Sequence, residues 1–435
     1  MMKSDKLVVC EELSVEAAES QNILIKGDNK KILPELIKEY GGKVKCIYID
    51  PPYNNGDSYV YYNDKIREED WLRDIRMTLN YLKLLLTKDG SIWISIDDRE
   101  MAYLKIEADR VFGRSNYVTT IVWQQRKSRE NRAVFSCNHE YILVYARDLK
   151  SFKKIRKLLP VSDDFVRARY KNPDNDPRGP WQSVTASVQA GHGVASQFYT
   201  IEAPTGIRHE PPKGRCWVYN EERMKREIAA GNIWFGSEGN GAPRIKKFLS
   251  SAKIGLTPST LWVGDMYGTT DSAKKHLLNL FPQKKNVFDT PKPEELIKSI
   301  MEISTDEDDI VLDCYLGSGT TITAAHKMNR HYIGIERGEQ MTELVLKRLK
   351  KVIAGESGGI SESVAWKGGG NFAFFRFSDQ AKDIIPRKLE TEKDSVRPKT
   401  SGKARQLPIW DTSESHTEYA QFDMAVSDTD SQYHK

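Results

Sequence analysis

Short apolar runs rich in β-branched residues recur along the chain, with amphipathic segments between several of them. Short, nearly continuous apolar runs predict strands that are buried on both faces of a sheet. These runs occupy residues 22–25, 45–50, 91–97, 117–123, 140–146, 309–315 and 331–336. Because strand patterns alternate with helix patterns, we expect an α/β fold with a mostly parallel sheet and right-handed crossovers.

Amphipathic patterns predict helices at 70–90, 292–305 and 339–353. We expect the first of these helices to end at Gly90, because glycine commonly terminates a helix. No helix pattern lies between the strands predicted at 117–123 and 140–146. We therefore expect these two strands to form an antiparallel hairpin at one edge of the sheet, with a basic loop at its tip.

The composition changes in the middle of the chain. Residues 151–275 are rich in Pro, Gly, Trp and Arg and show no clear alternation of apolar and polar residues. This pattern predicts a separate insert that divides one α/β domain into two halves, 20–150 and 276–378. The last segment, 379–435, is polar and poor in large aliphatic residues, which is typical of a tail without a packed core.

The overall composition excludes several classes of protein. Hydrophobic residues make up 39% and charged residues 29%, and no apolar run approaches the length of a membrane span. The first twenty residues lack the apolar core of a secretory signal. The five cysteines form no CxxC pair, so we expect neither a disulfide framework nor a metal site in a cytoplasmic protein. A net charge of +5 is compatible with a polyanionic partner.

A glycine-rich turn follows the predicted strand that ends at Asp313. Gly317 and Gly319 allow the backbone to turn tightly beside a ligand. Glu336 ends the next strand, 23 residues after Asp313, where an acid suits the hydroxyls of a ribose. Because Ile322 replaces a third glycine and no phosphate-binding lysine follows, the pattern favours an adenosine ligand without a pyrophosphate. A tight turn with no ligand is the alternative.

The sequence Asp50-Pro51-Pro52-Tyr53 comes directly after a predicted buried strand. Two prolines cannot continue a sheet, so they fix a stiff turn whose carbonyls point outward. The amino nitrogen of a nucleobase is a poor nucleophile, because its lone pair is delocalised into the ring. The Asp50 carboxylate and the Pro51 carbonyl can accept both amino hydrogens and orient the nitrogen for attack on a sulfonium methyl. Tyr53 can stack on a base flipped from a duplex. A rigid surface turn is the alternative.

These two motifs, in this order, resemble those of the beta class of DNA amino-methyltransferases. The chain is similar to modification subunits of type III restriction–modification systems and to solitary adenine-N6 methyltransferases, over roughly residues 20–375. The resemblance is carried by IDPPYNNGDSYVYYND, LLTKDGSIWISIDDRE, FGRSNYVTTIVWQQRKS, NHEYILVYARD, FDTPKPEELI and VLDCYLGSGTT. It implies a Rossmann-like, S-adenosylmethionine-dependent methyltransferase sheet with a circularly permuted motif order and an inserted target-recognition domain.

The resemblance also implies roles for individual residues. The catalytic residues would be Asp50, Pro51, Pro52 and Tyr53. The S-adenosylmethionine site would contain Asp28, Lys292, Pro293, Asp313, Tyr315, Gly317, Ser318, Gly319, Thr320 and Glu336. Tyr315 stands where the family usually has Phe, and we expect it to pack over the cofactor in the same way.

The implied target is adenine N6 in double-stranded DNA, because in this family an Asp at the start of the catalytic motif favours adenine. Cytosine-N4 methylation needs the same two acceptors and stays an alternative, as do an inactive DNA-specificity subunit and an RNA methyltransferase. Implied partners are a second copy of the chain and a restriction subunit. The implied location is the cytoplasm of a bacterium or archaeon, close to the nucleoid.

A basic stretch predicts contact with DNA. Between residues 126 and 171 there are thirteen Lys or Arg against five Asp or Glu. We expect phosphate contacts from Arg126, Lys127, Arg129, Arg132, Lys153 and Lys154. In the insert, we expect base contacts from Arg208, Arg215 and Arg244, with Trp181 as a further candidate and with Trp217 and Trp234 in the insert's own core. A solvated charged face is the alternative to phosphate contact.

Overall fold

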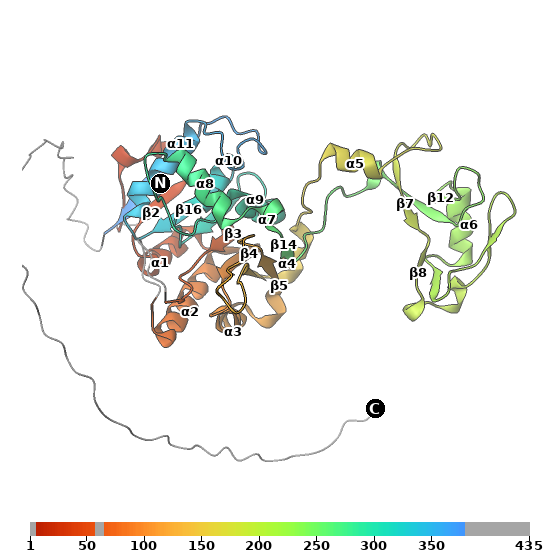
Figure 1. Ribbon diagram of the computed structural model, residues 1–435, viewed down its shortest axis with the longest axis horizontal. Helices are drawn as coiled ribbons and strands as arrows, with labels where there is room; N and C mark the ends of the chain where they lie inside the picture. The colour runs from red at the N-terminus through yellow and green to blue at the C-terminus, as the bar shows by residue number, and fades with distance from the viewer. Residues whose placement is uncertain (1–5, 57–64, 379–435) are drawn as a thin grey trace, which may run out of the picture. The chain divides into compact units, whose positions relative to one another are not determined.

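Ten strands form one sheet in the computed structural model, which describes residues 6–56 and 65–378 (Figure 1). The strand order is β1-β17-β2-β16-β15-β3-β4-β6-β5-β14. The bounds are β1 Leu7–Val9, β2 Ile23–Lys26, β3 Val44–Ile49, β4 Leu86–Ile96, β5 Tyr117–Trp123, β6 Glu140–Ala146, β14 Leu261–Trp262, β15 Ile310–Asp313, β16 His331–Glu336 and β17 Ala373–Phe377.

Most neighbouring strands are parallel, as predicted. The run from β17 through β4 is parallel throughout, whereas β1 is antiparallel to β17. Strands β4, β6 and β5 pair antiparallel, so the predicted hairpin of β5 and β6 is confirmed. Its predicted place at the sheet edge is wrong, because Leu261 and Trp262 of β14 pair parallel with Val122 and Trp123 of β5.

Helices cover both faces of the sheet. The side chains of β3 alternate, with Cys46 and Tyr48 on one face and Ile47 and Ile49 on the other, so the strand needs apolar cover on both sides. On the Ile47 face lie α1 Asn29–Tyr40, α2 Glu68–Leu85 and α3 Met101–Phe112. On the Cys46 face lie α9 Glu294–Ser304, α10 Thr320–Lys327 and α11 Leu346–Ile353, the last preceded by a π-helical turn at Met341–Val345.

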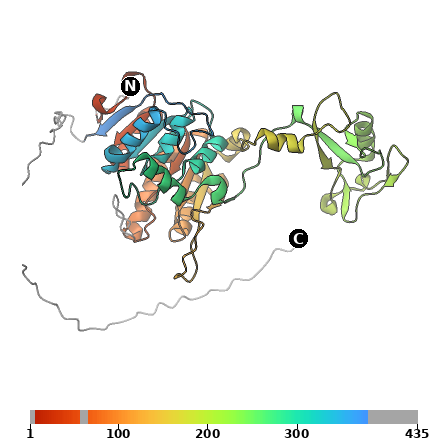
Figure 2. The same cartoon turned by 45° about the horizontal axis from the view of Figure 1, so that its top comes forward.

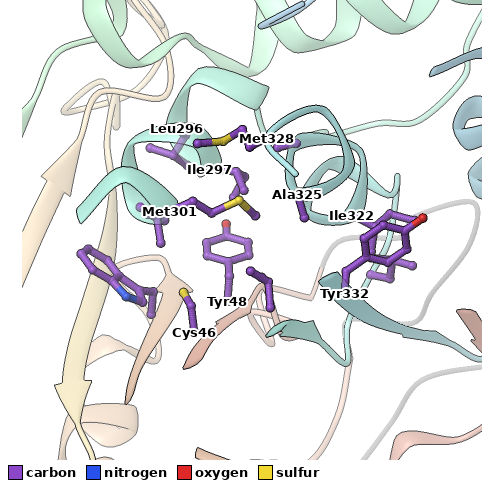
Figure 3. Packing of buried hydrophobic residues seen from close by; sticks show 14 of the residues in the cluster. Cys46, Tyr48, Leu296, Ile297, Met301, Ile322, Ala325, Met328 and Tyr332 are labelled. Carbon is purple, nitrogen blue, oxygen red and sulfur yellow. The ribbon is translucent and has the colours of Figure 1, made fainter. Parts of the chain in front are cut away.

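Figure 3 shows the packing on the Cys46 face. Apolar side chains of α9 and α10 face buried side chains of the strands there. The labelled residues are Leu296, Ile297 and Met301 of α9, Ile322 and Ala325 of α10, Met328, and Cys46, Tyr48 and Tyr332 of the sheet.

The helix predicted at 70–90 is shorter than expected at its carboxyl end. Helix α2 ends at Leu85, and the chain enters β4 at Leu86 without a loop. Gly90 lies inside that strand, where a Cβ atom would come within 2.9 Å of the Lys45 backbone oxygen. The glycine therefore permits close approach of β3 at an irregularity in strand pairing and does not end the helix.

The middle of the chain has small sheets and a core of its own. One sheet contains β7 Trp181–Thr185, β12 Ile233–Trp234 and β13 Arg244–Phe248; two-stranded pairs join β8 Ser187–Gln189 to β11 Arg215–Trp217 and β9 Ile201–Glu202 to β10 Arg208–His209. Helix α6, Glu221–Ala229, completes a hydrophobic cluster that contains the buried Trp217, as predicted. Trp181 is also buried, and its ring lies 5.5 Å from that of the half-buried Trp234.

The structure describes four further α-helices: α4 Leu149–Ile155, α5 Asp163–Arg169, α7 Gly264–Tyr267 and α8 Thr270–Leu280. The insert boundaries at 151 and 275 stay a prediction, although β14 of the main sheet lies within that range. The predicted tail, 379–435, lies outside the described residues. Among the helices that the structure describes, none combines the length and apolar character that a membrane crossing requires.

Candidate active site

Both predicted motifs lie at the carboxyl ends of the parallel strands. Asp50 follows β3, Asp313 ends β15 and Glu336 ends β16, so the topology places all three at one sheet edge. A cavity of about 370 Å³ opens there. Of the residues predicted for the two motifs, its wall contains Asp50, Pro51, Pro52 and Tyr53 together with Asp28, Lys292, Asp313, Tyr315, Gly317, Ser318, Thr320 and Glu336.

Four polar side chains form a cluster at the catalytic motif, in which Lys292 is buried and the other three are half-buried. Lys292 Nζ donates to Asp50 Oδ2 at 2.6 Å and to Tyr53 Oη at 3.1 Å, and it lies 3.3 Å from Glu140 Oε2. Tyr53 Oη lies 2.7 Å from Asp50 Oδ1 and 2.9 Å from Glu140 Oε2. Lys292 also lies over the Tyr53 ring, 5.3 Å from its centroid. The buried Lys292 ammonium group therefore contacts two carboxylates and a phenol.

Glu140 is the member of this cluster that the sequence analysis missed. It begins β6, which runs antiparallel to β4, so its side chain reaches the edge where the parallel strands end. A carboxylate at the start of an otherwise apolar hairpin strand was the available signal. Burial raises the pKa of Glu140, although Lys292 opposes that change. Burial alone would lower the pKa of Lys292, but Asp50 and Glu140 raise it, so the lysine stays charged.

Asp313 is held by the glycine-rich turn that follows it. Its Oδ1 accepts from Tyr315 N at 2.9 Å, and its Oδ2 accepts from Thr321 Oγ1 at 2.6 Å. These hydrogen bonds favour the ionised carboxylate, but burial outweighs them and raises the pKa of Asp313 to about 7. Its charge is therefore sensitive to pH near neutrality.

Glu336 closes the other side of the same turn. Its two carboxylate oxygens accept from Gly317 N and Gly338 N, each at 2.9 Å. Gly317 has a φ of +53°, which a residue with a side chain rarely adopts.

Gln340 lines the cavity and is only 3% exposed, and its Oε1 has no hydrogen-bond partner among the described residues. A buried acceptor without a donor points to a ligand that supplies one.

Gly319 and Pro293 are not among the residues that line the cavity. Gly319 has a φ of +81°, and a Cβ atom there would lie 3.1 Å from the Val345 side chain. Its glycine requirement therefore comes from backbone conformation and packing. Pro293 caps the amino end of α9 and positions Lys292 beside it.

The sequence comparisons agree with this geometry. A family model described as DNA methylase matches residues 44–347, more than half of the chain. The chain belongs to this DNA methylase family.

Several curated relatives extend the comparison. The chain is 34% identical over 340 residues to the type III restriction–modification enzyme StyLTI Mod subunit of Salmonella typhimurium, covering 71% of this chain and 50% of that protein. It is 27% identical over 380 residues to the EcoP15I Mod subunit of Escherichia coli, covering 71% and 56%. It is 24% identical over 330 residues to the DNA adenine methyltransferase YhdJ of Escherichia coli strain K12, covering 75% and 82%. The chain spans about half the length of the Mod subunits that it matches.

In this member of the DNA methylase family, the two proline carbonyls of the predicted catalytic motif differ in their surroundings. The Pro52 carbonyl accepts from Trp71 Nε1 of α2 at 2.7 Å, which anchors the turn to the helix layer. No hydrogen bond reaches the Pro51 carbonyl from any residue that the structure describes. Pro51 is therefore the carbonyl of the pair that is available to a substrate.

The residues predicted to contact phosphates are not equally available. The Arg126 guanidinium donates to the Cys137 carbonyl at 3.0 Å, and Lys127 forms an ion pair with Asp265. Arg129 and Arg132 lie exposed in the loop between β5 and β6. Lys153 and Lys154 are exposed in the last turn of α4.

The three arginines predicted to read bases differ in the same way. Arg215 Nε donates to Ser187 Oγ at 2.8 Å, and Arg244 donates to the Ser183 side chain of the neighbouring strand. Both guanidinium groups thus tie strands of the insert together. Arg208 Nε lies 3.7 Å from Oε2 of the exposed Glu202, and the Arg208 side chain is 76% exposed. Arg208 is the most accessible of the three.

Proposed function

We propose that this chain transfers a methyl group from S-adenosylmethionine to N6 of an adenine at specific sites in double-stranded DNA. The observation that carries the proposal is the cavity shared by Asp50–Tyr53 and the turn between Asp313 and Glu336. Membership of the DNA methylase family supports DNA as the substrate. The name of YhdJ, a DNA adenine methyltransferase, supports adenine as the target.

The residues of the cavity fit S-adenosylmethionine. Glu336 stands where ribose hydroxyls would be accepted, and the unpartnered Gln340 Oε1 would accept from an adenosine donor. Asp28 would lie near the adenine, and Lys292 would line the methionine end beside Asp313. When bound, the cofactor supplies a methyl group on a positively charged sulfur.

The catalytic turn suits an amino group as the nucleophile. The Asp50 carboxylate and the Pro51 carbonyl can each accept one amino hydrogen, which localises the nitrogen lone pair and aims it at the methyl group. Asp50 already accepts from Tyr53 and Lys292, one hydrogen bond on each oxygen. A carboxylate oxygen has two acceptor positions, so one remains on each side for the substrate.

Replacing Asp50 tests this proposal. In Asp50→Ala we expect methyl transfer to fall by about 100- to 1000-fold, because one of the two preorganised acceptors for the amino group is removed. Calorimetry should show that S-adenosylmethionine still binds, since we assign Asp50 to the substrate amino group and the cofactor to the turn between Asp313 and Glu336. Near-normal turnover of the variant would contradict the assignment.

Single-molecule sequencing of DNA from cells that express the chain would identify the product and its sequence context. N6-methyladenine at one recurrent site is the expected result. Detection of N4-methylcytosine would show that the target is cytosine and not adenine. Cofactor binding without any methylation would indicate an inactive specificity subunit.

We further propose that the chain assembles with a second copy and with a restriction subunit, close to the chromosome in a bacterial or archaeal cytoplasm. Support for the restriction partner comes from the two relatives named as Mod subunits. Co-purification of a co-expressed restriction subunit, with light scattering to measure stoichiometry, tests both assemblies.

A further inference from the structure

Residues 126–138 form most of the connection between β5 and β6, and this loop extends past the ends of the two strands (Figure 2). Hydrogen bonds cross it along its length and hold its two sides together. Arg126 N donates to the Asn138 carbonyl at 3.2 Å, Asn138 Nδ2 donates to the Ser128 carbonyl at 2.6 Å, and Glu130 N donates to Ser136 Oγ at 2.8 Å. The tied part is therefore a stalk, and residues 131–135 form its tip.

The tip presents apolar side chains to solvent. Val134 is 95% exposed and Phe135 is 90% exposed, whereas the next most exposed large hydrophobic residue in the described part of the chain is Met266 at 62%. Exposed Arg129 and Arg132 precede this pair in the sequence. An exposed aromatic ring in a loop that also carries two exposed arginines contributes nothing to the core. Its placement favours a partner that offers negative charge to the arginines and a flat stack to the ring.

The stalk stands at the mouth of the candidate active site. Gln125 and His139, which adjoin the 126–138 loop on either side, line the cavity, and so does Cys137 within it. The tip consequently lies on the same sheet edge as Asp50, because β5 runs in the direction of β3 and β4 while β6 returns from that edge. A duplex whose target base enters the cavity would pass within reach of this loop.

We infer that Phe135 inserts into the base stack of duplex DNA beside the target nucleotide, while Arg129 and Arg132 contact the flanking phosphates. This inference rests on the proposed function. Moving a base out of the stack costs unstacking and unpairing free energy, and an apolar wedge that fills the gap offsets part of that cost. The cations favour DNA over an apolar protein surface, because phosphates would neutralise them.

The test uses a synthetic duplex that carries the site mapped by sequencing. The target adenine is placed opposite thymine in one duplex and opposite an abasic residue in the other. In Phe135→Ser we expect kcat on the paired duplex to fall about 10- to 100-fold, because extrusion of a paired base loses its wedge. On the abasic duplex the variant should approach the wild-type rate, since the adenine is already unpaired.

Two further variants complete the design. Phe135→Trp retains a flat ring and should keep near-wild-type activity on both duplexes. Leu84→Ser is the matched control: Leu84 is 51% exposed near the end of α2, at the opposite sheet edge, and its replacement should change neither rate. Equal binding of S-adenosylmethionine by all variants will show that they are folded.

Wild-type activity of Phe135→Ser on the paired duplex would overturn the inference, as would an equal loss on both duplexes. A wild-type chain that methylates neither duplex would instead overturn the proposed function, and the inference with it. The two failures are therefore distinguishable.

Discussion

At the scale of single residues, the cluster around Asp50 has more acceptors than the Tyr53 hydroxyl can serve. That hydroxyl carries one proton but lies within hydrogen-bond distance of both Asp50 and Glu140. Lys292 supplies the remaining donors and is shared between the two carboxylates. When a substrate amino group forms a hydrogen bond with Asp50, the Glu140 carboxylate can still balance the positive charge of Lys292. We therefore regard Glu140 as a positioning residue for Asp50.

Replacing Glu140 by Gln should leave Asp50 as the one carboxylate paired with Lys292, so that the lysine competes with the substrate for Asp50. We predict a fall in kcat of about 10- to 100-fold, the range expected from misplacement of a reacting group, with unchanged S-adenosylmethionine affinity. Because burial raises the pKa of Glu140, acidification should protonate it and lower the wild-type rate toward that of Glu140→Gln. Parallel pH–rate profiles for the two proteins would contradict this role.

Asp313 gives a prediction about stability. Burial raises its pKa from 3.8 to about 7, so between these values the folded protein binds more protons than the unfolded chain. The protonated Asp313 side chain therefore stabilises the folded protein, and this contribution is complete below pH 4. It is lost as the pH rises through about 7, and the free energy of unfolding then falls by at most about 4 kcal/mol. Urea titrations should show a smaller decrease in the free energy of unfolding for Asp313→Asn over this range. Asp271→Asn, at an exposed ion pair with Lys275, should follow the wild type.

At the scale of secondary-structure elements, a buried ion network joins the helices on the Cys46 face of the sheet. Glu294 of α9 accepts from Lys327 of α10 at 2.8 Å and from Arg348 of α11 at 2.9 Å. Burial acts to raise the pKa of Glu294, but Arg348 and Lys327 outweigh it and lower that pKa to about 2. Arg348 also donates to the Ser318 carbonyl at 3.1 Å, so the network supports the glycine-rich turn as well.

We predict that Glu294→Gln lowers the free energy of unfolding by about 3–5 kcal/mol, because two buried cations lose their shared carboxylate. Urea denaturation would measure the loss, and cofactor affinity should weaken with it. Glu221→Gln is the control, since Glu221 pairs with Lys225 on the exposed surface of α6 and should cost less than about 1 kcal/mol. Equal losses of unfolding free energy in the two variants would show that the buried network does not stabilise the helices on the Cys46 face.

Elements with strong periodicity were predictable from the sequence, and those defined by tertiary pairing were not. The strands around Asp50, Asp313 and Glu336 are apolar on both faces, which local sequence reveals, and their carboxyl ends therefore pointed to the site. Two residues of β14 complete the sheet only through pairing with β5, which no local pattern encodes. Gly90 was misassigned for a related reason, since its requirement comes from the Lys45 backbone across the sheet.

At the scale of the whole molecule, we predict that the 126–138 loop sets overall affinity for DNA and that the insert sets sequence choice. Phosphates carry no sequence information, whereas base edges do. Replacing Arg129 and Arg132 by Gln should weaken binding to all duplexes alike and reduce the salt slope by about one for each phosphate that is no longer neutralised. Arg129 is a cleaner probe than Lys127, which is already paired with Asp265, whereas Arg132 Nε lies 3.7 Å from Glu130 Oε1.

Arg208 is the corresponding probe in the insert, because the guanidinium groups of Arg215 and Arg244 bind their own sheets. Replacing Arg208 by Ala should reduce discrimination between cognate and scrambled duplexes by about 1–3 kcal/mol if it contacts a guanine through two hydrogen bonds. Binding isotherms for both duplexes at several salt concentrations separate the two effects. Loss of discrimination in the loop variant, with discrimination retained in Arg208→Ala, would reverse the assignment of these two regions.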